Sequence, residues 1–247
     1  CNPMNKKEWF IDWFNSYYYH LLYKNRNDKE AKDFILNLVN YLNLNFESSA
    51  LDLGCGKGRH SFELRKYFKS VTGLDLSKNS IEEAKKHNLE GLFFTQQDMR
   101  FFNFDYKFNV IFNLFTSFGY FEETNDNLKI LLNCHQHLNK KGILLIDFFN
   151  AQKVIQNLVK QEVKKIDGIE FNIKRKINHN KIIKTIAFKD KNKNYYFQEK
   201  VQLLTQENFK SLLNKANFKL IKSFGSYHLT DFNINQSDRL ILLAEKK

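Results

Sequence analysis

Short apolar runs alternate with amphipathic stretches through the middle of the chain. The apolar runs have the length and residue types of buried strands and fall at 50–53, 71–76, 91–95, 109–114 and 142–148. Stretches with apolar residues at helical spacing lie between most of them, at 59–68, 77–88 and 124–138. Because strands that are apolar almost throughout alternate with helices, the pattern predicts a doubly wound α/β fold with a mostly parallel sheet.

Two helices are predicted before this region. Residues 9–23 form a stretch crowded with aromatic side chains. Residues 28–44 have one apolar face and begin with Asp28, a residue type that caps helix N-termini.

The alternation changes after residue 149. A helix is predicted at 151–160, and period-two patterning over 161–204 predicts antiparallel strands. Asp167-Gly168 has the sequence of a tight hairpin turn within this segment. A helix at 206–216 follows, and then two strands at 219–228 and 239–244. We therefore expect an antiparallel β insertion packed on the main domain.

Three glycines, Gly54, Gly56 and Gly58, follow the first predicted strand and precede a helix. Glycine lets a ligand approach the backbone closely, and a helix N-terminus offers free N–H groups. Ligands of open α/β sheets bind at the carboxyl ends of the strands. The loop therefore predicts a cofactor site, and dinucleotides and S-adenosylmethionine both fit such a place.

The spacing of glycines and acids separates these two cofactors. The dinucleotide fingerprint G-x-G-x-x-G, begun at Gly54, requires a glycine where this chain has Arg59. Asp75 ends the second predicted strand, where a carboxylate can accept hydrogen bonds from both hydroxyls of a ribose. Asp98 follows the third strand, where it can accept from an adenine amino group with Met99 beside the base. The loop and the two acids together favour S-adenosylmethionine.

The stretches ALDLGCGKGRHS, VTGLDLS, QQDMRFF and LFTSFGYF resemble the motifs of the class I (Rossmann-like) S-adenosylmethionine-dependent methyltransferases. With GRHS after the loop and SFGYF after the fourth strand, the chain looks most like the small-molecule branch, which includes sugar-amine N-methyltransferases. The resemblance implies a seven-stranded sheet with an antiparallel final strand pair. It also implies one domain over 1–247. This domain comprises a helical lid at 1–46, a cofactor-binding core at 48–150, the β insertion at 161–204, and a final helix and strand pair at 205–247.

The resemblance also implies where S-adenosylmethionine contacts the chain. The glycine loop surrounds the methionine part, Asp75 contacts the ribose, Asp98 and Met99 lie at the adenine, and residues 113–115 lie beside the sulfonium. The candidate cofactor-binding residues are Asp52, Gly54, Cys55, Gly56, Gly58, Asp75, Leu76, Asp98, Met99, Asn113, Leu114 and Phe115.

The acceptor site is expected near the aromatic N-terminal segment. A hydroxyl acceptor requires a general base, for which the candidates are His20, His60 and Tyr120. The candidate substrate-pocket residues are Tyr18, Tyr19, His20, Phe118 and Tyr120. The cluster at 134–137 contains one cysteine and two histidines, but helical spacing turns these side chains apart, so no metal site is expected.

Composition leaves the acceptor class open. The net charge of +12 is compatible with a nucleic-acid substrate, but the lysines are scattered along the chain. No Pro-Pro-aromatic stretch follows Asn113, which disfavours the DNA adenine and protein glutamine methyltransferases. A small-molecule methyltransferase is therefore the favoured hypothesis. An RNA or protein methyltransferase is the alternative, and a non-catalytic cofactor-binding protein is a third hypothesis.

The cysteines and the hydropathy pattern bear on location. Three widely spaced cysteines do not form a disulfide framework, and no apolar run approaches the roughly 20 residues of a membrane span. We expect a cytoplasmic protein that is a monomer or a homodimer and does not bind membranes. A lipid-modified Cys1 is the weaker alternative.

Overall fold

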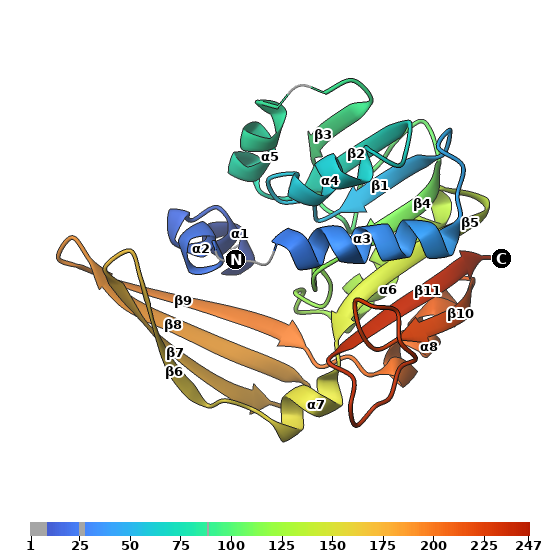
Figure 1. The fold of residues 1–247 in the computed structure, drawn as a ribbon. Helices are drawn as coiled ribbons and strands as arrows, with labels where there is room; N and C mark the ends of the chain where they lie inside the picture. The colour runs from blue at the N-terminus through green and yellow to red at the C-terminus, as the bar shows by residue number, and fades with distance from the viewer. Residues whose placement is uncertain (1–8, 25–27, 88) are drawn as a thin grey trace, which may run out of the picture.

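The computed structural model describes residues 9–24, 28–87 and 89–247, so Cys1 lies outside the described residues. Two sheets form the framework (Figure 1). The larger sheet comprises β1 (Ser49–Leu53), β2 (Ser70–Asp75), β3 (Leu92–Gln96), β4 (Phe108–Asn113), β5 (Leu138–Phe149), β10 (Phe218–Phe224) and β11 (Arg239–Lys246). The smaller sheet comprises β6 (Gln161–Ile166), β7 (Ile169–Asn178), β8 (Lys181–Asp190) and β9 (Lys193–Gln202).

The larger sheet has the strand order β10-β11-β5-β4-β1-β2-β3. Its first five strands in the chain pair in parallel, whereas β11 is antiparallel to both β5 and β10. The predicted fold class, with its seven strands and antiparallel final pair, is confirmed. Because the order reverses direction at β1, the carboxyl ends of β1 and β4 border the crevice where such sheets bind ligands.

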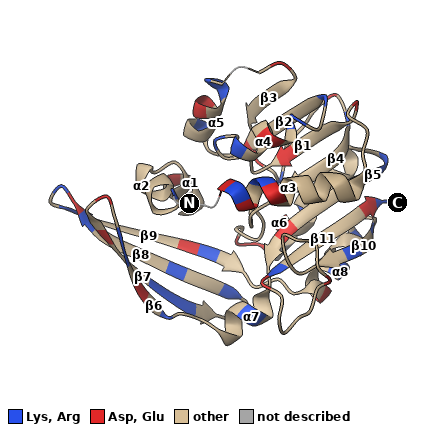
Figure 2. Cartoon of the chain, in the orientation of Figure 1, with Lys and Arg blue, Asp and Glu red and all other residues tan. Residues whose placement is uncertain are grey.

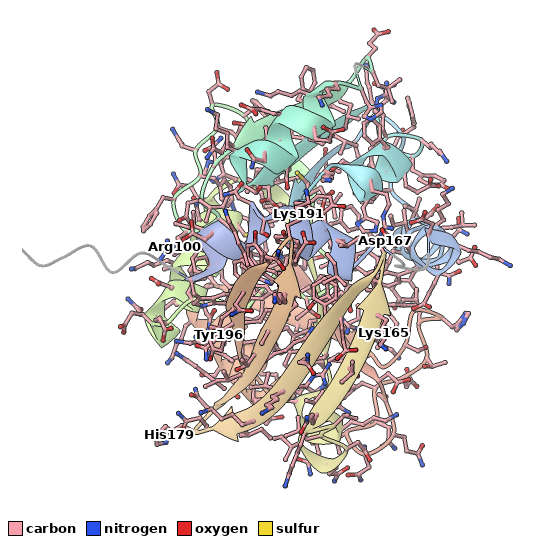
Figure 3. The ribbon with its side chains drawn as sticks, turned by 90° about the vertical axis from the view of Figure 1, so that its left-hand side faces the viewer. Arg100, Lys165, Asp167, His179, Lys191 and Tyr196 are labelled. Carbon is pink, nitrogen blue, oxygen red and sulfur yellow. The ribbon has the colours of Figure 1, made fainter. Side chains whose placement is uncertain are left out.

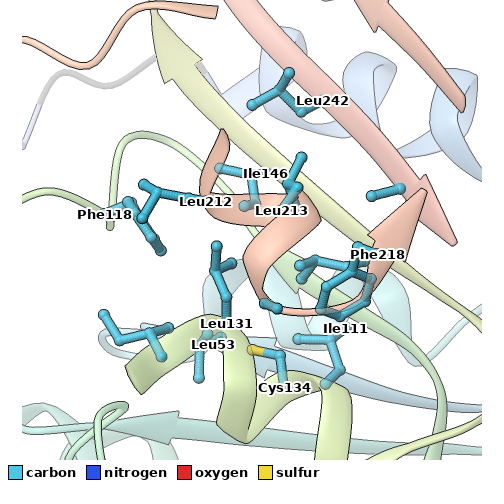
Figure 4. Packing of buried hydrophobic residues seen from close by; sticks show 14 of the residues in the cluster. Leu53, Ile111, Phe118, Leu131, Cys134, Ile146, Leu212, Leu213, Phe218 and Leu242 are labelled. Atoms are coloured by element: carbon cyan, nitrogen blue, oxygen red, sulfur yellow. The ribbon is translucent and has the colours of Figure 1, made fainter. Parts of the chain in front are cut away.

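Helices cover both faces of this sheet. On one face, α3 (Asp28–Leu42), α4 (Arg59–Leu64) and α5 (Lys78–Lys85) pack against residues such as Ala50. On the other face, α6 (Thr124–Gln136) and α8 (Gln206–Lys215) pack against residues such as Leu51. Figure 4 shows the second layer, in which Leu131 of α6 and Leu213 of α8 lie against apolar strand residues. Neighbouring strand residues thus serve opposite faces, which is why the strands are apolar almost throughout.

The aromatic N-terminal segment forms two short helices instead of the single helix predicted over 9–23. They are α1 (Trp9–Phe14) and α2 (Tyr17–Leu22). Ser16 adopts an extended conformation between them, and its hydroxyl accepts a hydrogen bond from the backbone N–H of Tyr18. This N-cap ends one helix and starts the next, because an extended residue cannot continue a helix.

The smaller sheet has the predicted antiparallel pairing, with the order β6-β7-β8-β9 and the hairpin turn at Asp167-Gly168. It follows α7 (Ala151–Gln156) and extends away from the larger sheet (Figure 1). Its apolar face packs mainly on the N-terminal helices, where Trp13 and Leu22 lie among the buried residues Phe171 and Ile186. The insertion therefore supports α1 and α2 more than it covers the main sheet.

The outer face of the insertion is turned away from these helices, and Figure 3 shows Tyr196 and Lys165 there. The turns at Asp167 and Lys191 lie at one end of the sheet and the turn at His179 at the other (Figure 3). The α2 region reaches the first of these ends, because the Tyr18 hydroxyl donates to Asp190 at 2.8 Å and Lys24 pairs with Asp167.

Most predicted boundaries differ from the structure by a few residues. The strand β5 begins at Leu138 and not at residue 142, because Leu138 pairs with Phe108 of β4. The predicted helices at 59–68 and 151–160 end early, at Leu64 and Gln156. Within the described ranges, the helices are too short and too polar to cross a membrane.

Candidate active site

A cavity of about 430 Å³ opens at the carboxyl ends of β1, β2 and β4 and is bordered by α1 and α2. This volume lies in the range of small-molecule sites. Three carboxylates line it, those of Asp52, Asp75 and Asp98. Aromatic side chains from α1, α2 and the loop after β4 complete the walls. Of the predicted lid at 1–46, α1 and α2 border the cavity, whereas α3 packs on the main sheet.

The glycine loop joins β1 to α4 and serves two purposes. Gly58 precedes α4 with φ of +82°, and a Cβ there would lie 2.5 Å from the ring of Phe94. Gly56 has φ of +55° and lines the cavity, and a Cβ there would meet nothing within 4 Å. Gly58 therefore lets α4 pack closely on the sheet, while Gly56 leaves its space open beside the cavity.

Asp52 is buried at the end of β1, where its carboxylate accepts a hydrogen bond of 2.6 Å from the Ser61 hydroxyl. Burial raises the pKa of Asp52 to about 6, and the nearby charge of Asp75 contributes to the rise. The Ser61 hydrogen bond opposes this shift. Asp52 is therefore a buried acid whose ionised form would be stabilised by a positive charge in the cavity.

Asp75 is the last residue of β2 and lines the same cavity. Its two carboxylate oxygens accept hydrogen bonds from the backbone N–H groups of Gly56, at 2.9 Å, and Ser77, at 2.8 Å. Burial raises the pKa of Asp75, and these backbone hydrogen bonds oppose the rise. The carboxylate is thus fixed in place at the cavity wall by the glycine loop on one side and the start of α5 on the other.

Asp98 lies two residues beyond β3, and Met99 follows it in the cavity wall. The guanidinium of Arg100 donates to both carboxylate oxygens of Asp98, with a shortest distance of 2.7 Å, and also reaches Asp126. The backbone N–H of Arg100 donates to the same carboxylate. This ion pair orients Asp98 and occupies part of its accepting capacity.

Aromatic rings from three segments meet at the α1–α2 side of the cavity. The Phe14 ring lies 5.0 Å from the Tyr19 ring and 5.3 Å from the Tyr120 ring. His20 also lines the cavity, and His60 at the start of α4 stacks on Phe115 at 4.2 Å. The three base candidates His20, His60 and Tyr120 are therefore all in the cavity wall.

The structure places most predicted site residues in the cavity wall. Among the cofactor-binding candidates, those that line it are Asp52, Gly54, Cys55, Gly56, Asp75, Leu76, Asp98, Met99, Leu114 and Phe115. Gly58 and Asn113 do not, because Gly58 packs against Phe94 and Asn113 is buried with its amide donating to the Leu53 carbonyl at 2.9 Å.

Two predicted substrate-pocket residues lie elsewhere. Tyr18 points to the insertion, where its ring packs against Phe188 and Tyr195. The break between α1 and α2 sets this direction, which a continuous helix would not give. Phe118 is buried in the main core against Phe209, because the loop after β4 turns this side chain into the layer beneath α8.

Sequence reasoning missed several cavity residues, including Phe10, Phe14, Thr116, Ser117 and Phe121. The signal for the last three was present, since all three belong to the LFTSFGYF stretch. For Phe10 and Phe14 the surplus of aromatics was visible, but which of them face the cavity depends on the helix break. Among the described residues, the structure gathers no group of three or more His, Cys, Asp or Glu side chains that could hold a metal ion.

The methyltransferase domain family model matches residues 45–217 of this chain. The chain belongs to this family. A methyltransferase-family relative from Streptomyces venezuelae, dTDP-3-amino-3,4,6-trideoxy-alpha-D-glucopyranose N,N-dimethyltransferase, is 32% identical over 100 residues, which cover 40% of the chain and 42% of the relative. The matches to curated methyltransferases span between 41% and 53% of the length of those relatives.

Solved structures of methyltransferases share the fold over nearly the whole chain. An S-adenosylmethionine-dependent methyltransferase from Clostridium acetobutylicum superposes with a TM-score of 0.79 at 21% identity, and the match covers 93% of this chain and 96% of that one. The sugar N-methyltransferase KedS8 from Streptoalloteichus superposes with a TM-score of 0.72 at 18% identity, covering 93% and 92%. At this coverage the insertion is part of a fold that other methyltransferases have.

Proposed function

We propose that this methyltransferase-family chain binds S-adenosylmethionine in the cavity and transfers its methyl group to a nitrogen or oxygen atom of a small molecule. One observation carries the proposal. The glycine loop and the aspartates at or just after the ends of three neighbouring strands line a single cavity that aromatic residues enclose.

The residues present fit this cofactor. Asp52 is a buried acid that would gain from a positive charge, such as the ammonium of the methionine part. Gly56 leaves open space beside the cavity wall. Asp75 would accept hydrogen bonds from the ribose hydroxyls, and Asp98 with Met99 would lie at the adenine.

The bound cofactor supplies a methyl group that is attached to a positively charged sulfur. When the methyl group is transferred, the sulfur is left as a neutral thioether. The chain therefore needs no acid for the leaving group, and its task is to hold the acceptor in line and exclude water. Proximity and orientation can account for ~7–11 kcal/mol of the barrier. The rings of Phe14, Tyr19 and Tyr120 line the cavity and would enclose the acceptor.

Proton removal depends on the acceptor. A neutral amine can attack without a base, whereas a hydroxyl must lose its proton. His20, His60 and Tyr120 are the candidates to receive that proton, since all three line the cavity. An amino sugar is the acceptor that the similar proteins support best, because two of the three named above act on amino sugars or are sugar N-methyltransferases.

A methyl-transfer screen tests the proposal. The purified chain would be incubated with S-adenosylmethionine and a panel of amino sugars, nucleotide-linked amino sugars, other amines and phenols, and the products would be identified by mass. We expect S-adenosylhomocysteine and a methylated product to form together on at least one small acceptor, and Asp75→Ala to lower the yield of both at limiting S-adenosylmethionine. Methylation of RNA or protein with no small acceptor would contradict the proposal.

We also propose that the chain works in the cytoplasm as a monomer or homodimer. The free, buried thiols of Cys55 and Cys134 are suited to a reducing compartment. Size-exclusion chromatography with light scattering would determine the oligomeric state.

A further inference from the structure

Two residues of the loop after β4 have an unusual backbone conformation. Phe115 and Thr116 are consecutive, neither is glycine, and both have a left-handed backbone with φ of +56° and +58°. This conformation is unfavourable for residues with a Cβ and persists only where the surroundings impose it. Both residues line the cavity.

Asp147 of β5 holds this turn from the side away from the cavity. Its side chain is fully buried, and one carboxylate oxygen accepts the backbone N–H of Phe115 at 2.8 Å. The backbone carbonyl of Asp147 accepts the N–H of Thr116 at 3.0 Å. A single residue of the neighbouring strand thus satisfies both N–H groups of the left-handed pair.

Arg239 joins Asp147 to the Phe115–Thr116 turn. It begins β11, and its Nε donates to the second carboxylate oxygen of Asp147 at 2.9 Å. Its Nη2 donates to the Thr116 hydroxyl at 2.8 Å. Tyr227 lies beside the pair, with its hydroxyl 3.3 Å from Asp147 and its ring under the guanidinium. Removing either charged partner would leave the other buried and unpaired.

We propose that Asp147 and Arg239 are positioning residues that fix the Phe115–Thr116 turn as the wall of the cavity at its reacting end. The role rests on the proposed function, since it places this turn beside the methyl group to be transferred. Neither charged residue lines the cavity, so both act through the turn. The fixed turn also seats the ring of His60, which stacks on Phe115.

Conservative variants separate this role from general stabilisation. Thr116→Val keeps the shape of the side chain but removes the acceptor for Arg239, whereas Thr116→Ser keeps the hydroxyl. Arg239→Lys keeps the charge but loses the planar fork that reaches two partners. Arg175→Lys is a matched control, because Arg175 is as exposed as Arg239 and pairs with Glu162 in the insertion, away from the cavity.

Two readouts on the 247-residue chain decide the proposal. Hydrogen exchange followed by mass spectrometry reports the protection of the amides of Phe115 and Thr116, and calorimetric titration with S-adenosylhomocysteine reports affinity. We expect Thr116→Val and Arg239→Lys to speed exchange in the peptide that contains this turn and to weaken binding about tenfold or more, with exchange elsewhere unchanged. Arg175→Lys should match the parent in both, and Thr116→Ser should lie closer to the parent than Thr116→Val.

Unchanged exchange and affinity in Thr116→Val and Arg239→Lys would overturn the proposal. So would faster exchange spread evenly over β4 and β5, which indicates a purely structural role. If the parent chain itself fails to bind S-adenosylhomocysteine, the proposed function fails, while the exchange data still show whether the pair fixes the turn.

Discussion

The burial of Asp52 has a direct consequence for the stability of the fold. Its pKa in the folded chain, about 6, exceeds its ordinary value of 3.8. Below pH 3.8 it is protonated in both the folded and unfolded states, and above pH 6 it is ionised in both. The folded state therefore loses stability as the pH rises from about 4 to 6, by up to about 3 kcal/mol.

Asp52→Asn should remove this loss, since the amide keeps an acceptor for Ser61 but carries no charge. Urea unfolding should show the variant to be more stable than the parent at pH 7.5, by up to about 3 kcal/mol, and nearly equal at pH 4. A stability difference that does not change between the two pH values would show that the charge of Asp52 is not the cause.

Asp75→Ala tests the assigned ribose contact. We expect S-adenosylhomocysteine to bind more weakly by ~1.5–3 kcal/mol, the scale of hydrogen bonds to a charged group, or roughly ten- to hundredfold. Because Asp75 also holds Gly56 and Ser77, urea unfolding must first confirm that the variant is folded. Asp105→Ala, at an exposed aspartate, is the control. A folded Asp75→Ala chain that binds like the parent would contradict the assignment.

Site residues were predictable where the backbone path fixes them. Asp52 and Asp75 end parallel strands, so their positions follow from the strand pattern alone. Tyr18 and Phe118 lie outside the cavity wall, because the direction of a side chain on a short helix or loop depends on packing. The role of Asp147 could not be foreseen, since its partner Arg239 lies 92 positions away in the chain.

At the scale of elements, two glycines of the loop after β1 have different roles: Gly58 allows close packing, and Gly56 borders the cavity. Gly58→Ala should destabilise the fold by about 2–4 kcal/mol, because the new Cβ meets Phe94 and the backbone is left-handed. Gly56→Ala meets no neighbour and should cost only about 1–2 kcal/mol, yet it should weaken S-adenosylhomocysteine binding. Urea unfolding and calorimetry on both variants compare the two effects. Equal stability of Gly58→Ala and the parent would refute this difference in roles.

Glu199 of β9 links the insertion to the N-terminal helices by hydrogen bonds. Its carboxylate accepts the indole N–H of Trp13 at 2.8 Å and the hydroxyl of Tyr23 at 2.6 Å, and Lys184 lies 3.5 Å away. Burial lowers the pKa of Lys184, and the charge of Glu199 opposes that shift. These contacts fix α1 and α2 beside the cavity.

Glu199→Ala should loosen α1 from the insertion. The chain has two tryptophans, Trp9 and Trp13, and both lie in α1, so its tryptophan fluorescence reports on this helix alone. We expect a red-shifted emission that acrylamide quenches more readily, with little change in circular dichroism. Glu207→Ala, at an exposed glutamate of α8, should leave the emission unchanged. The same emission in Glu199→Ala and the parent would show that Glu199 does not hold α1.

Elements with strong periodicity were predicted well, and their junctions were not. The central strands of the larger sheet follow from short apolar runs, and those of the smaller sheet, with the hairpin at Asp167-Gly168, follow from alternating patterns. The break at Ser16 was missed, because an aromatic run fits one helix or two and only packing on the insertion selects between them.

At the scale of the whole molecule, the net charge of +12 is spread over both sheets and several helices (Figure 2). Several basic residues near the cavity have acidic partners, as Lys24 has Asp167 and Arg59 has Asp28. An RNA substrate would require a continuous basic surface beside the cavity and would give strongly salt-dependent binding. The dispersed charge favours the small-molecule acceptor over this alternative.

Calorimetric titration of the parent chain with S-adenosylhomocysteine and, separately, with NADH tests the central claim most directly. The cavity, its glycine loop and its aspartates predict micromolar binding of S-adenosylhomocysteine and no binding of NADH. Binding of NADH alone would contradict the assigned cofactor, and binding of neither would contradict the claim that the cavity holds S-adenosylmethionine.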